Sequence, residues 1–377
     1  MKVAAAILGI LCIIVIAFDA FETIVLPRRV VRRVRVAKIF YRVSWAGWSM
    51  LGRKLRPGNR REFYLSYYGP LSLILLLFLW AALFILGFAL INWGLSLPMQ
   101  APEKVLSFGS YLYMSGTTFV TLGLGDITPL SGSGRFLAVL EGGIGLGFLA
   151  LVIGYVPVIY QTFSRREVNI SLLDARSGTP PSGPELLIRH YNGQSPDELI
   201  QYLRDWERWC AELLESHLSY PVLAYYRSQH ENQSWLSALT TLLDTCALIL
   251  VGIEGMPAKP AKFIFAMARH TAVDLTQSFG IDPVKTHRKY APDDFTRLCT
   301  ELAARGIVLR DDDDAGKRLK ELRQMYEPFV EALAYYLIVD LPDLHVIPDR
   351  VDDWQTSAWD HFLAASPRTL DRAMRRG

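Results

Sequence analysis

The residues from Thr121 to Asp126 read Thr-Leu-Gly-Leu-Gly-Asp, and their types and spacing suit the binding of a dehydrated cation. Glycine at alternate positions lets the backbone adopt conformations closed to L-residues, so successive carbonyl groups can point the same way. A ring of such carbonyls around a symmetry axis can replace the hydration shell of a potassium ion. The predicted K+ ligands are therefore backbone atoms of Thr121, Leu122, Gly123 and Leu124, and Gly125 and Asp126 complete the ion-binding stretch.

Three hydrophobic segments flank this stretch along the chain. They run from about Val3 to Leu26, from Pro70 to about Trp93, and from about Phe136 to Tyr160. A bilayer core requires about 20 apolar residues per helix, so all three segments are long enough to span a membrane. The first segment could instead be a signal peptide, because it begins with Met1-Lys2 and stays apolar to Phe18.

The charge is unevenly distributed, although 40 basic and 37 acidic side chains give a net charge of only +3. Residues 27–61 carry twelve Lys and Arg and no Asp or Glu. With Lys2, Asp19 and Glu22 also set aside, 27 basic and 35 acidic residues remain over 62–377. Because Lys and Arg near membrane helices stay on the cytoplasmic side, the basic segment is predicted to be cytoplasmic. The chain is then a multi-pass protein of the cell membrane, with its N-terminus outside and its C-terminal half in the cytoplasm.

The basic segment has an apolar periodicity of its own, which predicts a helix along the membrane surface. Such a helix would show one apolar and one cationic face, suited to the headgroup layer of a membrane with anionic lipid, so lipid contact is expected over residues 28–61. A voltage-sensing helix is the less favoured alternative for the cations at every third position, because the segment is too charged to span without acidic partner helices. These cations are Arg29, Arg32, Arg35 and Lys38, and the apolar positions are Val30, Val31, Val34, Ile39, Phe40, Val43, Trp45 and Trp48.

A short helix is predicted over residues 102–120, immediately before the ion-binding stretch. Pro102 and Glu103 would occupy its first turn, where a missing N–H is harmless and a negative charge suits the helix dipole. The helix and the stretch lie between the second and third hydrophobic segments, so they would form a loop on the outer side of the membrane.

In these residues the sequence resembles the potassium channels that have two membrane helices flanking a pore loop. The family signature Thr-Val-Gly-Tyr-Gly-Asp corresponds to the six residues from Thr121, followed at the family's spacing by Pro129, Gly134-Arg135 and Gly145. The resemblance covers about residues 66–165. It implies an α-helical membrane protein with the tetrameric pore-loop channel fold, a homotetramer because each chain supplies one filter strand. It also implies passive potassium transport without catalysis and without a cofactor other than K+ as the permeant ion.

Two departures from the family pattern concern selectivity. The central filter position is Leu124 rather than Tyr, so it lacks the hydroxyl that braces the filter in typical members. Met114 stands at one of two positions where those members often carry Trp, and Tyr113 keeps an aromatic at the other. The Tyr hydroxyl of typical members and its partner on the short helix are therefore absent together, so no buried polar group is left without a hydrogen bond. Potassium preference is therefore expected, less stringent than with Tyr, and a nonselective cation channel is the alternative.

Glu141 is an ionisable residue at membrane depth, which makes it a functional candidate. Thr117 occupies the position behind the filter where some family members carry Glu. One interpretation places the Glu141 carboxyl behind the filter, hydrogen-bonded to the preceding short helix near Thr117 or Thr118. The other makes it a charge that lines the cavity and concentrates cations.

The third hydrophobic segment carries the predicted gate. Proline inside a helix removes one hydrogen bond and bends the helix, and Pro157 lies near the cytoplasmic end, where four converging helices would narrow the pore. Gly145 and Pro157 are the predicted hinge points. The hydrophobic gate is expected at Val156, Val158 and Ile159.

The C-terminal half predicts an all-α cytoplasmic domain, so the chain divides into residues 1–26, 27–65, 66–165 and 166–377. A linker is expected over Ser177–Pro184, which is rich in Pro, Gly and Ser. The apolar run Trp235–Ile253 contains Asp244 and is predicted to be a core helix rather than a fourth spanning helix. Helices are expected over residues 196–218, 219–230, 234–253, 258–278, 291–305 and 314–339.

This half contains no glycine-rich strand–helix turn for a dinucleotide and no β-rich segment of the type that binds cyclic nucleotides. The four Cys and seven His show no spacing typical of metal ligands, and no nucleophile–base set is apparent. Its ligand and the gating stimulus cannot be named from these residues. A second class of protein therefore remains as an alternative. This is a membrane-anchored signalling or scaffold protein that acts through its C-terminal domain and whose pore region does not conduct.

Overall fold

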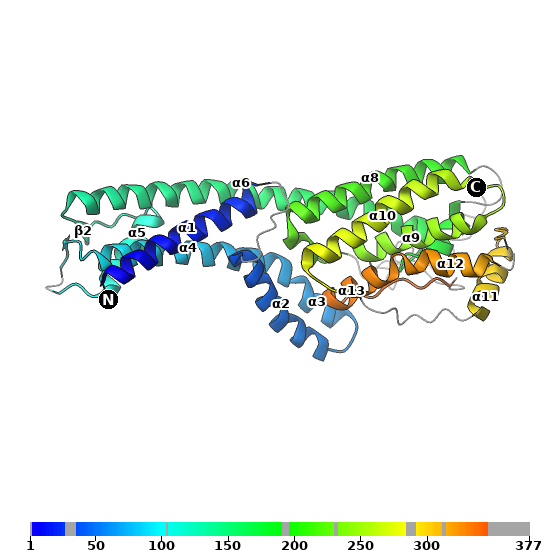
Figure 1. Cartoon of the computed structure of the whole chain (residues 1–377), viewed down its shortest axis with the longest axis horizontal. Coiled ribbons are helices and arrows are strands. Elements are labelled where there is room, and N and C mark those ends of the chain that lie inside the picture. The colour runs from blue at the N-terminus through cyan, green and yellow to red at the C-terminus, as the bar shows by residue number, and fades with distance from the viewer. Residues whose placement is uncertain are drawn as a thin grey trace, which may run out of the picture. The chain divides into compact units, whose positions relative to one another are not determined.

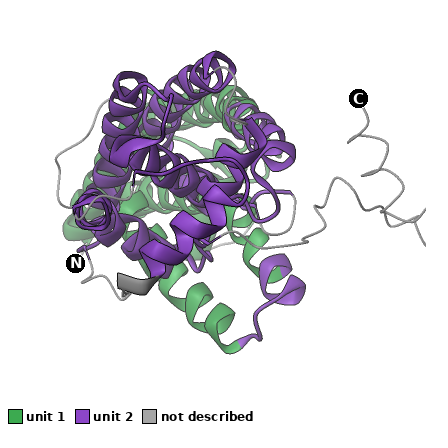
Figure 2. Ribbon diagram, turned by 90° about the vertical axis from the view of Figure 1, so that its right-hand side faces the viewer, with its two compact units in different colours: residues 1–54, 64–161 green, residues 55–63, 162–377 purple. Residues whose placement is uncertain are grey.

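The structure is a computed structural model that describes residues 2–26, 35–102, 105–190, 196–229, 233–283, 292–310 and 314–345. Most of these residues are helical (Figure 1), which confirms the α-helical membrane protein class. The chain forms two compact units, residues 1–54 with 64–161 and residues 55–63 with 162–377 (Figure 2). Four basic residues of the predicted amphipathic segment lie outside the described residues, and these are Arg28, Arg29, Arg32 and Arg33.

The first unit contains the helices that flank the ion-binding stretch. They are α1 (Lys2–Ile24), α2 (Val36–Lys54), α4 (Tyr68–Gly94), α5 (Phe108–Phe119) and most of α6 (Gly132–Ser177), and α3 (Asn59–Ser66) crosses the boundary between the units. The strands β1 (Met99–Gln100) and β2 (Thr128–Pro129) pair antiparallel, with Met99 opposite Pro129. The helical stretches 2–24, 59–94 and 132–177 are long and apolar enough to cross a membrane.

Small residues bring α1 and α4 into close contact. A Cβ atom added to Gly9 would lie 2.5 Å from the Gly87 carbonyl oxygen, and one added to Gly94 would lie 2.5 Å from the Ala6 nitrogen. Such backbone-to-backbone approach is typical of membrane helices, which associate by packing rather than by the hydrophobic effect. At the other end of α1, the buried Asp19 accepts hydrogen bonds from Trp80 Nε1 of α4 and the Ala37 amide of α2, both at 2.9 Å. Asp19 therefore fixes α2 and α4 to the end of α1.

Helix α2 packs part of its predicted apolar surface inside the first unit, so only the remaining part is exposed. Trp45 is only 3% exposed and packs edge-on against Tyr68, while Trp48 stacks on Tyr64 with 4.6 Å between ring centroids. The opposite face carries Val43, which is 66% exposed. The tryptophans face Tyr64 of α3 and Tyr68 at the start of α4, because these rings offer them contacts that solvent does not.

The C-terminal domain is a bundle around α9 (Trp235–Gly252), against which α7, α10, α12 and α13 pack. Nearly every residue of α9 is buried, and Asp244 accepts a hydrogen bond from the Tyr326 hydroxyl. The apolar run is thus the core helix of this domain. The other elements are α7 (Gly183–His190), α8 (Asp197–Ser219), η1 (Pro221–Tyr225), α10 (Ala258–Phe279), α11 (Pro292–Ala303), α12 (Ala315–Gln324) and α13 (Glu327–Leu337).

Three of the predicted segments differ in the structure. The expected linker is a packed turn, because Thr241 Oγ1 donates to Pro181 O at 3.1 Å and a Cβ at Gly183 would lie 2.9 Å from the Thr245 nitrogen. Only the short 3₁₀ turn η1 replaces the helix expected over 219–230. The helix expected over 314–339 is divided after Gln324, since the buried Tyr326 turns toward Asp244 and Pro328 begins a new helix.

Candidate ion-conducting site

Helix α5 aims its C-terminal end at the ion-binding stretch. It begins at Phe108 rather than near Pro102, because Ser107 and Ser110 form a capping box that satisfies free N–H groups at this point. At its other end, the Leu122 and Gly123 amides donate to Thr117 O at 2.8 and 3.2 Å. The Thr121 amide donates to Thr118 O at 3.0 Å. The amides that follow α5 are therefore turned back toward the helix.

The backbone of the ion-binding stretch alternates in handedness. Thr121, Gly123 and Gly125 have φ values of +58°, +55° and +76°. A Cβ at Gly123 or Gly125 would meet no atom within 4 Å, so these glycines serve the backbone conformation rather than a close contact. In the described part of the chain, no hydrogen bond ends on the carbonyl oxygens of Thr121, Leu122, Gly123 or Leu124. These oxygens remain available to a ligand.

The predicted filter-support residues lie on α5, and most of them pack toward one another. The Tyr113 hydroxyl hydrogen-bonds the Asp126 carboxylate, which links α5 to the outer end of the stretch. Met114 is 2% exposed, its carbonyl accepts from Thr117 Oγ1 at 3.0 Å, and its sulfur accepts from Thr118 Oγ1 at 3.5 Å. Both threonine hydroxyls are thus used within α5.

Glu141 is fully buried within the single chain and contacts α5. Its partner is Ser115, whose hydroxyl donates to Glu141 Oε1, rather than Thr117 or Thr118. The same hydroxyl lies 2.9 Å from Ile85 O of α4, so Ser115 joins three helices. The sequence analysis missed Ser115. Its place one helical turn after Tyr111, which is also buried, is the periodic signal that could have revealed it.

The predicted hinge and gate residues lie along one continuous helix. α6 runs unbroken through Gly145 and Pro157, and a Cβ at Gly145 would lie 1.9 Å from the Phe119 carbonyl oxygen. Gly145 therefore allows α6 to touch the end of α5, whether or not it also bends. Val156 and Val158 are 40% and 39% exposed, whereas Ile159 is 1% exposed and already packed inside the chain.

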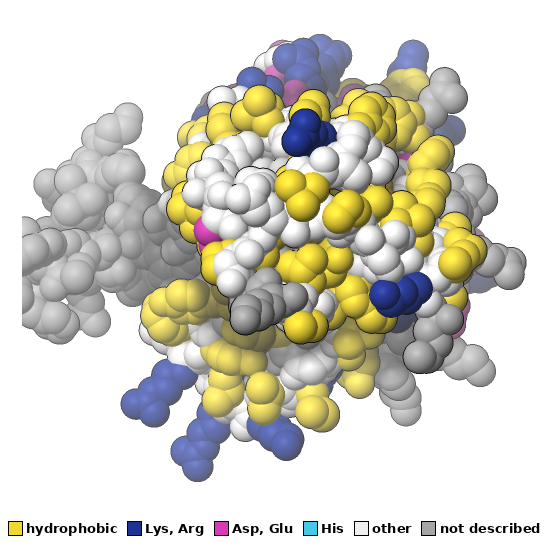
Figure 3. All heavy atoms as spheres, turned by 90° about the vertical axis from the view of Figure 1, so that its left-hand side faces the viewer, with side chains coloured by type: hydrophobic (Ala, Val, Ile, Leu, Met, Phe, Trp, Pro, Cys, Tyr) yellow, Lys and Arg dark blue, Asp and Glu magenta, His cyan; other side chains and the backbone are white. Residues whose placement is uncertain are grey.

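An apolar cavity of about 440 Å³ reaches from the base of the ion-binding stretch to the predicted gate. Its walls come from α4, the end of α5 and α6, and they include Thr121, Gly145 and Val156. The end of the molecule shown in Figure 3 presents mainly hydrophobic and uncharged atoms. Among the residues that the structure describes, no group of three His, Cys, Asp or Glu side chains could hold a metal ion.

One comparison with known proteins falls on this region. Residues 72–161 match the family model Ion_trans_2, described as an ion channel. The chain is also 27% identical over 211 residues to the "Uncharacterized membrane protein YdjJ" of Bacillus subtilis (strain 168), an alignment covering 55% of this chain. The chain spans 60% of the length of that relative. No solved structure matches. Residues 72–161 are thus similar to an ion channel family, and the fold is that of an α-helical membrane protein.

Proposed function

We propose that the protein conducts potassium passively through a filter formed by Thr121 to Leu124. The observation that carries this proposal is the alternating handedness at Thr121, Gly123 and Gly125, with the preceding amides turned toward α5. Such a backbone can present successive carbonyl oxygens on one side, where they substitute for water around a potassium ion. The bound K+ would be the permeant ion, and no catalytic step is involved.

Four copies would surround the ion. One chain supplies a single filter strand, and a ring of carbonyls needs a symmetry axis. The side chains of Leu122 and Leu124 are 61% and 59% exposed in one chain, as are apolar residues along α6 such as Val139 (76%). A homotetramer would cover part of this surface, and lipid would cover the rest.

The orientation follows from the basic residues, which would stay on the cytoplasmic side of the membrane. The basic segment and the C-terminal domain would then be cytoplasmic, and the filter would lie on the outer side. The exposed face of α2 would then lie against the inner leaflet. Ile39, Val43 and Met50 are 49%, 66% and 58% exposed, and Lys38 and Arg42 are exposed beside them. An apolar stripe flanked by cations suits anionic lipid.

A probe on a cysteine at Val43 tests this lipid contact. Brominated anionic lipid should quench the probe, and should leave a probe on a cysteine at the exposed Glu212 of α8 unquenched. Equal quenching at the two positions would contradict the assignment of α2 to the membrane surface.

A nonselective cation channel is the second candidate, and the exposed aliphatic Leu124 favours it. A leucine side chain has no hydroxyl to brace the filter, so the carbonyl cage would rely on the link between Tyr113 and Asp126. Flexible carbonyl ligands discriminate less between ions of different size in one view of selectivity. Reversal potentials in mixed potassium and sodium distinguish the two candidates.

Potassium flux from liposomes tests the filter assignment. Gly123→Ala should abolish the flux, because alanine disfavours the left-handed conformation at that position. The matched control is Gly47→Ala on α2, where a Cβ meets no atom within 4 Å. Flux that survives Gly123→Ala would refute the filter. Absence of flux from the parent chain would favour the third possibility, a scaffold that acts through its C-terminal domain.

A further inference from the structure

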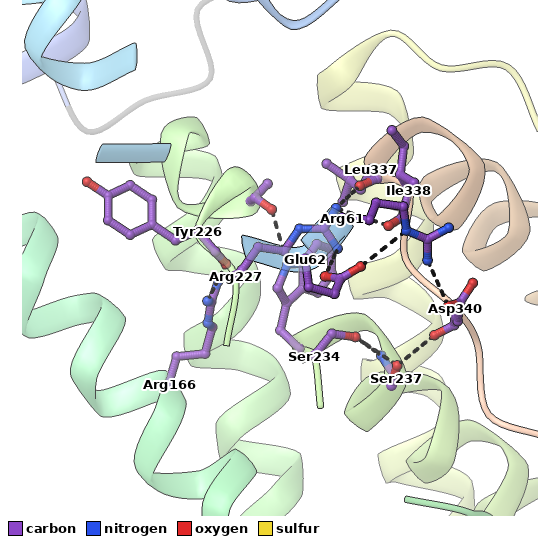
Figure 4. Close-up of polar contacts among 12 residues, drawn as sticks. Arg61, Glu62, Arg166, Tyr226, Arg227, Ser234, Ser237, Leu337, Ile338 and Asp340 are labelled. Carbon is purple, nitrogen blue, oxygen red and sulfur yellow. Dashed lines mark hydrogen bonds and ion pairs between the residues drawn. The ribbon is translucent and has the colours of Figure 1, made fainter. Parts of the chain in front are cut away.

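A buried arginine holds α6 beyond the predicted gate (Figure 4). The Arg166 side chain is 5% exposed, and its Nη1 and Nη2 donate to the carbonyl oxygens of Leu223 and Tyr226 at 2.9 and 2.7 Å. Its Nε donates to Glu167 Oε1 at 3.0 Å, which supplies the opposite charge. The planar guanidinium thus binds three acceptors in a fixed fork, a geometry that the single ammonium nitrogen of lysine does not offer. Beyond the predicted gate, α6 is therefore in fixed contact with η1 and the turn that follows it.

The next residue of that turn holds two further elements. Arg227 is 12% exposed, its Nη1 lies 3.3 Å from Glu62 Oε2 of α3, and its Nη2 donates to Ile338 O at 3.0 Å. The Ile338 carbonyl and the neighbouring Leu337 carbonyl, which Arg227 also contacts, end α13. A cation at a helix C-terminus is favoured by the helix dipole. Arg227 therefore joins α3 to α13 (Figure 4).

The contact with α3 is important because α3 leads into α4, the membrane helix that precedes the filter. α3 ends at Ser66, and α4 begins at Tyr68. Arg61 adds a second contact, with its Nη2 3.0 Å from Asp340 Oδ2, but Asp340 is 90% exposed, so this pair contributes little. The stronger links are those of Arg166 and Arg227. Through two consecutive residues, 226 and 227, the C-terminal domain contacts the segments that continue into both helices flanking the filter.

We propose that Arg166 and Arg227 are positioning residues that couple the C-terminal domain to the gate on α6. The proposal rests on the channel function proposed above and names how that function is regulated. A rearrangement in the domain that moves the turn at Tyr226 and Arg227 moves the ends of both membrane helices together. The stimulus would be whatever changes the bundle around α9, and its effect would reach Val156 and Val158 through the continuous helix α6.

The rate of cysteine modification near the gate tests this coupling in the full chain in liposomes. The background carries Cys12→Ala and Cys299→Ala, since these two thiols are partly exposed, and Val156→Cys reports gate accessibility to a charged methanethiosulfonate. Arg166→Gln, Arg227→Gln and Glu62→Gln should each change the rate about tenfold, all in the same direction. The double variant Arg227→Gln/Glu62→Gln should change it no further than the larger single effect, because both remove one link.

A matched control separates coupling from a simple change of charge. Arg297→Gln breaks the exposed pair with Glu301 on α11, whose Nε–Oε1 distance is 2.8 Å, and should leave the rate unchanged. Single-channel conductance and reversal potential should also stay constant in every variant, since none touches the filter.

Rates in Arg166→Gln and Glu62→Gln equal to that of Arg297→Gln would overturn the proposal. If Arg166→Gln fails to assemble, Glu62→Gln decides, because the Glu62 side chain is 38% exposed and Arg227 keeps its hydrogen bonds to the Leu337 and Ile338 carbonyl oxygens. The modification rate does not depend on conduction. A parent chain without potassium flux would therefore contradict the channel function, and the rates would still show whether the gate region responds to the domain.

Discussion

The first unit and the C-terminal domain are both built from apolar helices, but the helices bury their side chains in opposite ways. The most apolar part of α6 is 11% buried within the chain, whereas that of α9 is 89% buried. Both helices would pass as membrane spans by composition alone. The comparison teaches that a spanning helix leaves its apolar surface for lipid or another copy, whereas a core helix covers it with its own chain.

The two regions also use different residues where their helices meet. In the first unit, glycines bring backbones together at Gly9, Gly87 and Gly145. In the C-terminal domain, hydroxyls and a carboxylate meet inside the bundle, as Thr241 does with Pro181 and Asp244 with Tyr326. Steric substitutions should therefore damage the first unit most, and loss of a polar partner should damage the second.

Gly145→Ala should have the largest effect. Its Cβ would lie 1.9 Å from the Phe119 carbonyl oxygen, which is backbone and cannot rotate away. Overpacking of this kind costs about 3 kcal/mol, so potassium flux and thermal stability should both be lost. Gly143→Ala, where a Cβ meets no atom within 4 Å, is the control. Similar behaviour of the two variants would show that the contact of α6 with α5 is not required.

Tyr326→Phe should destabilise the C-terminal domain by about 2 kcal/mol, because it removes a hydrogen bond to a buried carboxylate. Thermal unfolding of the purified chain measures the effect. Ser219→Ala, which removes an exposed hydrogen bond to Glu215, should change the unfolding temperature little. Filter selectivity should be the same in both variants, and a change in Tyr326→Phe alone would contradict the separation of the two regions.

A third prediction concerns pH and the buried His217. Burial and the nearby Arg166 cation hold the pKa of His217 well below its ordinary value. Its Nδ1 lies 2.9 Å from Leu213 O and its Nε2 lies 3.3 Å from Arg166 Nη1, so the neutral ring donates to Leu213 and accepts from Arg166. Below pH about 6.5 His217 is protonated in the unfolded chain but stays neutral in the folded domain. The free energy of unfolding should therefore decrease as the pH falls.

Thermal unfolding at a series of pH values checks this prediction. Below pH about 6.5, His217→Gln should reduce the slope of the free energy of unfolding against pH by about 1 kcal/mol per pH unit. His270→Gln is the control, because His270 is 59% exposed. An unchanged slope in His217→Gln would show that the ring is protonated in the folded state.

The smallest effect is expected from Tyr113→Phe, which removes the hydrogen bond to Asp126 at the surface of the first unit. The relative permeability to sodium should rise about threefold, since one link at the outer end of the filter is lost while its carbonyls remain. Reversal potentials measure the change, with Tyr335→Phe on α13 as a control at a side chain 70% exposed. A control that shifts as much would rule out a role for Tyr113 in the filter.

Much of the fold could be predicted from local pattern. Hydropathy located the spanning segments, and Asp244 identified the α9 run as a core helix because a carboxylate inside a membrane would be costly. The filter assignment depends on glycine spacing and stays a prediction until ion flux is measured. Local pattern failed at the start of α5, where Ser107 competes with Pro102 as a helix start and its hydroxyl supplies the cap.

Contacts between distant residues were not predictable. Glu141 accepts a hydrogen bond from Ser115 rather than from Thr117 or Thr118, because only the Ser115 hydroxyl points between α4 and α6. The partners of Arg166 lie on a turn that the helical pattern of residues 219–230 had concealed. A periodicity shows which face is apolar, but it does not show which neighbour covers that face, as the two faces of α2 illustrate.

The sequence by itself determined the number and length of the apolar helices, the asymmetry of charge and the glycine pattern of the ion-binding stretch. These depend on composition and spacing within a few turns of chain, where helix geometry and burial are local. Tertiary structure alone decided that Gly145 touches α5, that α9 is enclosed, that Arg166 contacts a residue 57 positions further along the chain, and that Arg227 reaches one 111 positions away. Such contacts require the chain to close long loops, so they depend on the packing of whole helices rather than on any one of them.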